Sequence, residues 1–311
     1  MDTSDFTIGI PIFNDAKYIR ATLDSCVKQA SNIVIYDNCS TDESTAICAE
    51  YAAKYPNIKH VIHAENLGNF VNFGQLALDC KTEYFMWLGA HDLLSENYVE
   101  VLLNDIRKHP DAALIVPKVL HINEDGSFRK KVTDMSKWSS ELQTQEDPLL
   151  RMAAFIKDHF GSKKHDSLIL QGIFRTKVLQ KSWIPQACIA FDDAVLANAA
   201  AYGKIIYNND AEYFARWFKK TRKKADEPKR IFHGGKIPAG GAMSRSILVI
   251  EVMKTILGIS EQRGDIKDVF KLTCLVQKYV ESPRRARKSK NRKIIAAIIV
   301  ALIAGVSLCV F

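Results

Sequence analysis

The chain has 311 residues, of which 47% are hydrophobic and 25% charged, a composition typical of an ordinary globular protein with a sizeable core. Its formal net charge of +8 at pH 7 is concentrated, because seven basic side chains lie within residues 284–293, a stretch without an acid. The rest of the chain carries only +1, and this near-neutral balance argues against a nucleic-acid-binding surface on the folded part.

Cysteine usage argues against a disulfide framework and a zinc site. The seven cysteines are scattered, odd in number and without a Cys-x-x-Cys pair. We expect them to be small buried hydrophobic residues in a reducing cytosol. The acidic start, residues 1–5, leads directly into an apolar run, so we expect no signal peptide.

Taken in chain order, the first part of the sequence alternates apolar runs with amphipathic segments. They predict strands at 6–13, 33–36, 58–63, 84–88 and 113–116, and helices at 16–30, 41–55, 70–80 and 96–107. Asn14-Asp15 is expected to cap the first helix, and Ser40-x-x-Glu43 is the pattern of a capping box for the second. Short connections between these elements predict an α/β fold with a doubly wound, mainly parallel sheet.

The run Tyr84–Leu88 has the strongest strand pattern, and a polar pair, His91-Asp92, follows it. Ligands of open α/β sheets bind beyond the carboxyl ends of the strands. An imidazole and a carboxylate at such a place can hold a divalent cation. No dinucleotide-binding or P-loop glycine pattern is present in the sequence, which favours a metal as the group that manages phosphates.

After Pro117 the alternation fades. We predict a polar loop at 133–147, strands at 168–174, 205–207 and 212–217, and helices at 149–160, 187–201, 245–257 and 266–280. A basic connection at 219–230 and a glycine-rich loop at 233–241 form either a lid over the donor or a solvated linker.

The order of these signals resembles the inverting GT-A glycosyltransferases (glycosyltransferase family 2-like), over residues 6–217. The matching segments are Pro11-Ile12-Phe13-Asn14, Asp37-Asn38-Cys39-Ser40-Thr41-Asp42, Asn66-Leu67-Gly68, Gly89-Ala90-His91-Asp92 and Asp192-Asp193. The resemblance implies a Rossmann-like sheet with helices on both faces and a nucleotide-diphospho-sugar donor.

By this resemblance Asp37 accepts a hydrogen bond from the base ring of the nucleotide. The other nucleotide-binding positions it implies are Pro11, Phe13, Asn14, Asn66, Gly68 and Arg216. Asp37 has an alternative role in shaping an Asx turn, and Arg216 has one as an ordinary surface arginine.

The metal motif departs from the family pattern, because Gly89 and His91 stand where the family has aspartates. Asp92 and His91 are the expected metal ligands, and the imidazole favours Mn²⁺ over Mg²⁺. His91 has two alternative roles: it donates a hydrogen bond to a metal ligand without binding the metal, or it is an ordinary loop histidine.

The implied chemistry is a single displacement that inverts the anomeric carbon. It needs one base for the acceptor hydroxyl and a metal for the departing diphosphate. Asp193 is the candidate base and Asp192 the reserve, while the alternative is that the pair caps a helix. The mechanism requires Asp92 and Asp193 to converge on one cleft.

The carboxyl-terminal end predicts a membrane anchor. Residues 294–311 carry no charge, and a helix of that length spans about 27 Å. The basic block 284–293 should stay on the cytoplasmic side, together with the catalytic domain. We therefore expect a glycan or a lipid-linked acceptor at the membrane surface, as in polysaccharide biosynthesis.

The expected organisation is a nucleotide-sugar-binding half (1–117), an acceptor-binding half of the same catalytic domain (118–232), a flexible loop with a helical extension (233–283), the basic block (284–293) and the membrane helix (294–311). A second hypothesis is a non-catalytic sugar-nucleotide-binding or scaffold protein of a glycan-assembly complex. A nucleotidyltransferase is disfavoured because Asn14-Asp15-Ala16-Lys17 is not a glycine-rich phosphate loop.

Overall fold

The computed structural model describes residues 2–133, 140–161, 170–185 and 191–218, and a few residues between 252 and 262. The predicted basic connection, glycine-rich loop, last helix, basic block and membrane helix (219–230, 233–241, 266–280, 284–293 and 294–311) lie outside them. Among the residues that are described, no helix has the length and apolar character needed to cross a bilayer.

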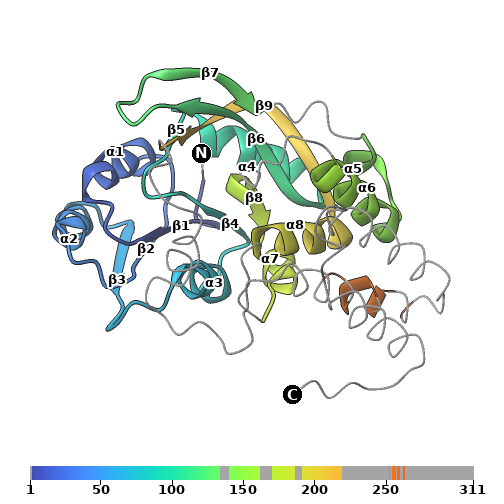
Figure 1. Cartoon of the computed structure of the whole chain (residues 1–311), viewed down its shortest axis with the longest axis horizontal. Helices are drawn as coiled ribbons and strands as arrows, with labels where there is room; N and C mark the ends of the chain where they lie inside the picture. Colours follow the sequence, from blue (N-terminus) through green and yellow to red (C-terminus); the bar gives the residue numbers. More distant parts are fainter. Residues whose placement is uncertain are drawn as a thin grey trace, which may run out of the picture.

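One mixed sheet organises the described residues, with the strand order β3-β2-β1-β4-β8-β6-β9-β5 and with β7 paired to β6 (Figure 1). The strands are β1 Phe6–Ile12, β2 Ile33–Asp37, β3 Ile58–Ile62, β4 Tyr84–Trp87, β5 Leu93–Leu94, β6 Ala112–Ile122, β7 Phe128–Thr133, β8 Ile173–Arg175 and β9 Lys204–Arg216. Strands β1–β4 are parallel to one another, as predicted. Beyond β4 the sheet is mixed: β6 and β9 are parallel to each other, but β8 lies antiparallel between β4 and β6, and β5 and β7 are also antiparallel to their neighbours, which the prediction of a mainly parallel sheet did not include.

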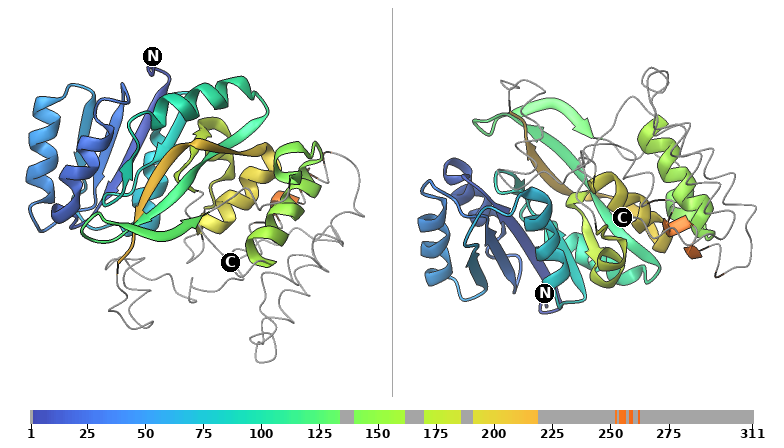
Figure 2. Two further views of the ribbon diagram at one scale, coloured as in Figure 1. Left: turned by 90° about the horizontal axis from the view of Figure 1, so that it is seen from above. Right: turned by 60° about the horizontal axis from the view of Figure 1, so that its bottom comes forward.

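Helices cover both faces of the sheet. The helices are α1 Ala16–Cys26, α2 Ser44–Lys54, α3 Asn69–Asp79, α4 Tyr98–Lys108, α5 Glu141–Thr144, α6 Pro148–Gly161, α7 Thr176–Ser182 and α8 Phe191–Tyr202. Helices α1, α2 and α4 share one buried apolar cluster, and α3, α5, α6, α7 and α8 share the other. Figure 2 shows α1 and α2, in blue, gathered beside the blue strands β1–β3.

The alternating pattern of β4 explains how one short strand joins the two clusters. Phe85 and Trp87 point into the cluster of α3 and α8, whereas Tyr84 and Met86 point into that of α1 and α4. All four side chains are buried, and burial of each such side chain contributes roughly 1.5–3 kcal/mol. Because β4 is anchored on both faces, the turn that follows it starts from a fixed point.

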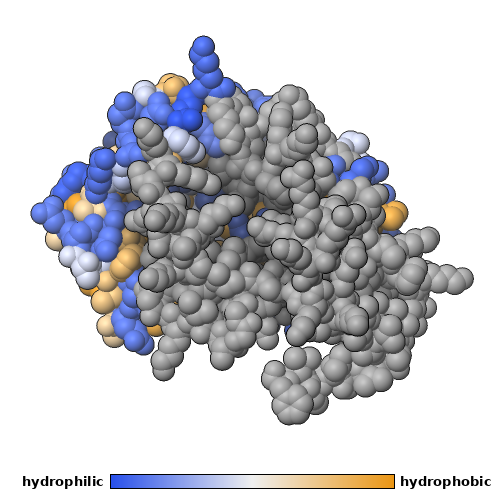
Figure 3. Space-filling model, viewed as in Figure 1, coloured by the Kyte–Doolittle hydropathy of each residue, from blue (hydrophilic) through white to orange (hydrophobic). Residues whose placement is uncertain are grey.

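Three of the cysteines confirm the expectation of burial, namely Cys26, Cys48 and Cys80, while Cys39 is half-buried in a loop. On the face seen in Figure 3, hydrophilic side chains cover much of the visible amino-terminal part, with apolar side chains in smaller groups between them.

The structure corrects several predicted elements after β4. Strand β6 runs through Pro117, and its pairing with β9 shifts register between Val116 and Lys118, so an irregularity accommodates the missing N–H of the proline. The expected boundary between the two halves at residue 117 therefore falls inside a strand. Strand β9 is continuous where two strands were predicted, helix α5 lies in the segment predicted as loop, and helix α7 lies in a segment for which no element was predicted.

Candidate active site

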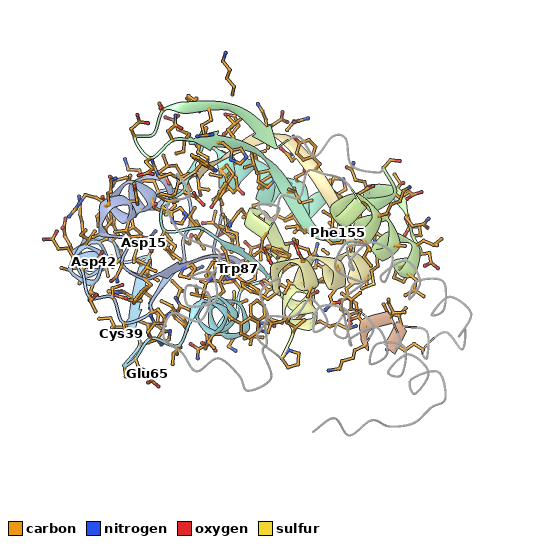
Figure 4. All side chains as sticks on the ribbon, in the orientation of Figure 1. Asp15, Cys39, Asp42, Glu65, Trp87 and Phe155 are labelled. Atoms are coloured by element: carbon orange, nitrogen blue, oxygen red, sulfur yellow. The ribbon has the colours of Figure 1, made fainter. Side chains whose placement is uncertain are left out.

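The loops that follow β1 and β2 are locked together at the carboxyl edge of the sheet. The Asn14 N–H donates to the Ser40 hydroxyl (3.0 Å), and the Thr41 N–H donates to the Asn14 side-chain oxygen (2.8 Å). The Asp42 carboxylate accepts from the Ala16 N–H (3.1 Å) and the Ser44 N–H (2.9 Å). Figure 4 labels Asp15 and Asp42 in this region.

These bonds overturn the predicted capping arrangement. Helix α2 begins at Ser44 without a Ser40–Glu43 box, because the Ser40 hydroxyl is used by the first loop. Helix α1 has no cap from the Asp15 side chain, and its first N–H is satisfied by Asp42 of the second loop instead. The loop after β1 and the loop after β2 thus satisfy each other's backbone N–H groups.

Two residues of these loops, Asn14 (φ 58°) and Cys39 (φ 61°), have left-handed backbone conformations. Asparagine adopts this conformation more readily than most residues. Cys39 stands where the family pattern has glycine, and a side chain there costs roughly 1–3 kcal/mol. The loop keeps a glycine-like shape despite the substitution.

The Asp37 carboxylate at the end of β2 is fully buried. One oxygen accepts from the Ser40 N–H (2.8 Å), and the other accepts from the Thr45 hydroxyl and lies 3.7 Å from His60 Nε2. Burial alone would raise the pKa of this carboxyl, but these neighbours outweigh it and lower the pKa to about 2. Asp37 therefore organises its own loop through Ser40 and Thr45.

Asn38 joins the second loop to the segment Asn66-Leu67-Gly68. Its amide donates to the Asn66 side-chain oxygen (2.8 Å) and its own oxygen accepts from the Leu67 N–H (2.8 Å). A carboxylate, which the family pattern has at this position, cannot make the first of these bonds because it has no proton to donate. Gly68 (φ 83°) then leads into α3.

The first predicted motif lies against this arrangement. Pro11 is within β1, paired in register with Tyr36 of β2, and Phe13 follows the strand. The N–H of Phe13 donates to the Asp15 carboxylate (3.1 Å). The predicted residues Pro11, Phe13 and Asn14 therefore lie at the same sheet edge as the Asp37 loop.

The turn Gly89–Asp92 follows β4 and contains a buried carboxylate. Asp92 is 4% exposed, and its oxygens accept from the Tyr213 hydroxyl (2.7 Å) and the Arg216 backbone N–H (2.7 Å). Burial raises the pKa of Asp92, although the neighbouring His91 opposes this effect. A Cβ at Gly89 would lie 2.6 Å from an Asp92 oxygen, so the family's aspartate does not fit at position 89 in this arrangement.

His91 is the accessible side chain of this turn. Its Nδ1 lies 3.6 Å from an Asp15 oxygen and its Nε2 lies 3.9 Å from an Asp92 oxygen, and 36% of its side chain is exposed. Burial alone would lower the pKa of His91, but Asp92 and Asp15 outweigh it and raise the pKa. Asp15 was expected only as a helix cap, and the signal that could have revealed its role is its position directly after a strand.

The residues present fit a divalent cation that is shared with phosphate. Within the described ranges, no group of three or more His, Cys, Asp or Glu side chains could hold a metal alone. His91 and Asp15 offer one nitrogen and one oxygen, a donor set that suits Mn²⁺, and phosphate and water would complete the shell. Asp92 is committed to Tyr213 and Arg216, so its predicted role as a direct ligand requires those bonds to rearrange.

Arg216 holds the turn from the carboxyl-terminal side. Its Nε donates to the His91 carbonyl (2.8 Å), and its Nη1 donates to the carbonyls of Asn123 (3.1 Å) and Glu124 (2.9 Å). These contacts place Arg216 beside the candidate metal residues, and its predicted contact with a diphosphate is not established by them. Tyr213 was not among the predicted site residues, although it precedes Arg216 in the same strand.

The acidic pair Asp192-Asp193 lies in the first turn of α8, where the helix dipole favours negative charge. The ring of the preceding residue, Phe191, packs against two rings of α3, with its centroid 5.4 Å from that of Phe70 and 6.0 Å from that of Phe73. Because α3 follows the Asn66–Gly68 segment, the start of α8 packs near the amino-terminal loops. The convergence of Asp193 and Asp92 on one cleft stays a prediction.

Comparison with known proteins gives a consistent picture. The model of the family described as glycosyl transferase family 2 matches residues 7–164. The minor teichoic acid biosynthesis protein GgaB of Bacillus subtilis (strain 168) is 26% identical over 153 residues, 46% of this chain and 17% of that protein. Chondroitin synthase of Escherichia coli is 27% identical over 125 residues, 39% of this chain and 18% of that protein. The chain thus spans less than a fifth of the length of these two relatives.

Solved structures share the fold. Staphylococcus aureus TarS 1–349 in complex with UDP-GlcNAc matches with a TM-score of 0.60 and 16% identity, over 96% of this chain and 81% of that one. The mannosyltransferase PcManGT from Pyrobaculum calidifontis, in complex with GDP-Man and Mn²⁺, matches with a TM-score of 0.51 and 14% identity, over 98% and 87%.

Proposed function

The chain belongs to glycosyl transferase family 2 and is a glycosyltransferase, and from this we propose that it moves a sugar from a nucleoside-diphosphate donor to a hydroxyl of a glycan or lipid-linked acceptor, with inversion at the anomeric carbon. The observation that carries the proposal is the meeting of three loops at one sheet edge. Contacts link the loop of Asn66 to that of Asp37, and the loop of Asp37 to that of Asn14, whose neighbour Asp15 faces His91. Proteins of similar fold bind UDP-GlcNAc and GDP-Man, which supports a donor of this class.

The donor's diphosphate would lie beside Asp15 and His91, which would hold a divalent cation, Mn²⁺ rather than Mg²⁺. When bound, such a cation acts as a Lewis acid that neutralises the charge of the leaving diphosphate. Asn14 and the Asp37 loop would orient the nucleoside at the same edge. Arg216 keeps the His91 carbonyl in place while the donor binds.

The acceptor would enter from the side of α8. Its hydroxyl oxygen attacks the anomeric carbon while the bond from that carbon to the diphosphate oxygen breaks, and Asp193 takes the hydroxyl proton. Asp192 is the reserve for this role. One carboxylate base suffices for inversion, because no covalent intermediate is formed.

The acceptor and the location of the enzyme rest on sequence alone. The relatives named for teichoic acid and chondroitin synthesis support a polysaccharide product. The uncharged end at 294–311 and the basic block before it favour a membrane anchor, with the catalytic domain on the cytoplasmic side. The family and the named relatives support an enzyme rather than a non-catalytic scaffold protein.

The test is the Asp193→Asn variant of the full chain, compared with Asp192→Asn, which tests the reserve one position away. General-base catalysis contributes about 10²–10⁴-fold, so we expect Asp193→Asn to lower kcat at least about 100-fold with little change in donor KM. The assay measures nucleoside diphosphate released from a panel of UDP- and GDP-sugars, with Mn²⁺ and membrane extract as the acceptor source. Wild-type turnover by Asp193→Asn would exclude Asp193 as the base.

A further inference from the structure

The turn Gly89–Asp92 is held from two sides by hydrogen bonds. From α1, the Thr22 hydroxyl lies 3.0 Å from the Ala90 carbonyl and 2.9 Å from the Asp92 carbonyl. From β9, Arg216 contacts both His91 and Asp92. The side chain of His91 is therefore presented by a backbone that has few ways to move.

Tyr213 closes this turn with a single hydroxyl. The oxygen accepts from the Gly89 N–H (3.2 Å), and its proton goes to the Asp92 carboxylate (2.7 Å). The first and last residues of the turn are thus bridged by a side chain that is fully buried. A buried hydrogen bond to a carboxylate is stronger than one between neutral groups, and no water can replace it without opening the core.

The bridge sets the position of His91 relative to Asp15. His91 lies between the two bridged ends, one residue from Asp92, and its Nδ1 is 3.6 Å from the Asp15 carboxylate. If the Tyr213 hydroxyl is removed, Gly89 and Asp92 each lose a partner, and the turn can relax. The group that moves is the one that faces the candidate donor site.

We propose that Tyr213 is a positioning residue of the glycosyltransferase, which acts through His91 by bridging Gly89 and Asp92. The proposal rests on the proposed function, in which His91 meets the cation and diphosphate of the donor. Tyr213 itself contacts neither, because its hydroxyl is enclosed by the turn and by β9.

Tyr98 provides a matched control. It is also fully buried, its ring lies 6.2 Å from that of Tyr213, and its hydroxyl donates to the Gln171 carbonyl. Tyr98→Phe and Tyr213→Phe each remove one buried hydroxyl from the same cluster. Only Tyr213→Phe releases the turn, so a general loss of stability affects both variants and a loss of position affects one.

The experiment is a double-mutant cycle on the full chain with His91→Ala. We measure the affinity for Mn²⁺ by electron paramagnetic resonance, with UDP and with GDP present, and the donor KM and kcat. Tyr213→Phe should weaken Mn²⁺–nucleotide binding at least tenfold, and Tyr98→Phe should change it less than twofold. In the His91→Ala background, Tyr213→Phe should have no further effect, because the residue it positions is gone.

A second readout separates this inference from the proposed function. The chain has 8 histidines, so ¹⁵N-histidine labelling gives few ring signals, and the His91→Ala spectrum identifies that of His91. Tyr213→Phe should shift the His91 ring signals and Tyr98→Phe should leave them in place. Unmoved His91 signals, or effects of Tyr213→Phe and His91→Ala that simply add, overturn the positioning role. A wild-type protein that binds and turns over no sugar nucleotide overturns the proposed function instead, whatever the His91 signals do.

Discussion

Two buried carboxylates, Asp37 and Asp92, stand at the carboxyl edge of the same sheet and are held in opposite ways. The hydrogen-bond partners of Asp37, Ser40 and Thr45, follow it by 3 and 8 residues. Those of Asp92, Tyr213 and Arg216, follow it by 121 and 124 residues. The Asp37 loop is therefore built from local sequence, and the turn of His91 depends on β9.

The surroundings also affect the two acids differently. Around Asp37, His60, Ser40 and Thr45 outweigh burial and lower the pKa to about 2. Around Asp92, burial outweighs the donors and raises the pKa. Charge is thus stabilised in the local loop and disfavoured in the long-range turn.

The largest expected effect comes from Asp92→Ala, which tests the long-range half of the comparison. The change leaves the buried Tyr213 hydroxyl and the half-buried Arg216 N–H without their acceptor, and a buried group left in this way costs about 1–3 kcal/mol. We expect the free energy of unfolding to fall by about 4 kcal/mol, measured by urea denaturation. Asp92→Asn keeps one acceptor and should lose less; a loss below about 1 kcal/mol for Asp92→Ala would show that the two donors find other partners.

A smaller effect is expected from Asp37→Asn, and it depends on pH. The folded pKa of about 2 lies below the ordinary 3.8, so ionised Asp37 stabilises the fold by about 2 kcal/mol above pH 4. That contribution is lost as the pH falls from about 4 to about 2. The stability difference between wild type and Asp37→Asn, followed by denaturant titrations from pH 6 to pH 2, should shrink accordingly.

The contribution of Asp92 to folding stability should depend on pH with the opposite sign to that of Asp37. Its folded pKa is raised, so protonated Asp92 stabilises the fold at low pH, and this contribution is lost as the pH rises through the folded pKa. The same titrations on Asp92→Asn provide the comparison. Parallel profiles for the two asparagine variants would mean that both acids sit in equivalent surroundings.

The smallest effect is expected from Thr22→Val. Valine keeps the shape of threonine and removes only the hydroxyl that contacts the carbonyls of Ala90 and Asp92. We expect a loss of about 1 kcal/mol in the free energy of unfolding. If Thr22→Val lost as much stability as Asp92→Ala, the turn would be held mainly by α1 and not by β9.

The amino-terminal fold was predictable because its information is local. Strands β1–β4 and helices α1–α4 fall within a few residues of their predicted positions, since each buried strand ends at polar residues and each connection is short. Beyond β4, Pro117 was taken to end a strand, whereas a register shift lets β6 continue past it. The apolar run at 168–174 could not reveal that β8 would insert antiparallel between β4 and β6, because that choice depends on strands far away in sequence.

The candidate site, like the fold, has a part that could be predicted from the sequence and a part that could not. Motif order placed Asn14, Asp37 and Asn66 at one edge, and the structure joins their loops through Ser40 and Asn38. Asp15 was missed because a carboxylate before a helix suggests a cap. The role of Tyr213 was not predicted, because a tyrosine in an apolar strand carries no sign of a partner 121 residues earlier.

The position of β9 has a consequence for the nascent chain. The part that matches the family ends at residue 164, and β9 begins at Lys204. A ribosome that has released residues 1–164 has delivered every group that Asp37 needs, yet the turn beside it lacks both of its β9 contacts. The turn of His91 is therefore completed only after β9 has been made, and a protein cut short before Tyr213 would carry assembled nucleotide loops beside a turn that Thr22 still holds from α1 but that lacks its contacts to β9.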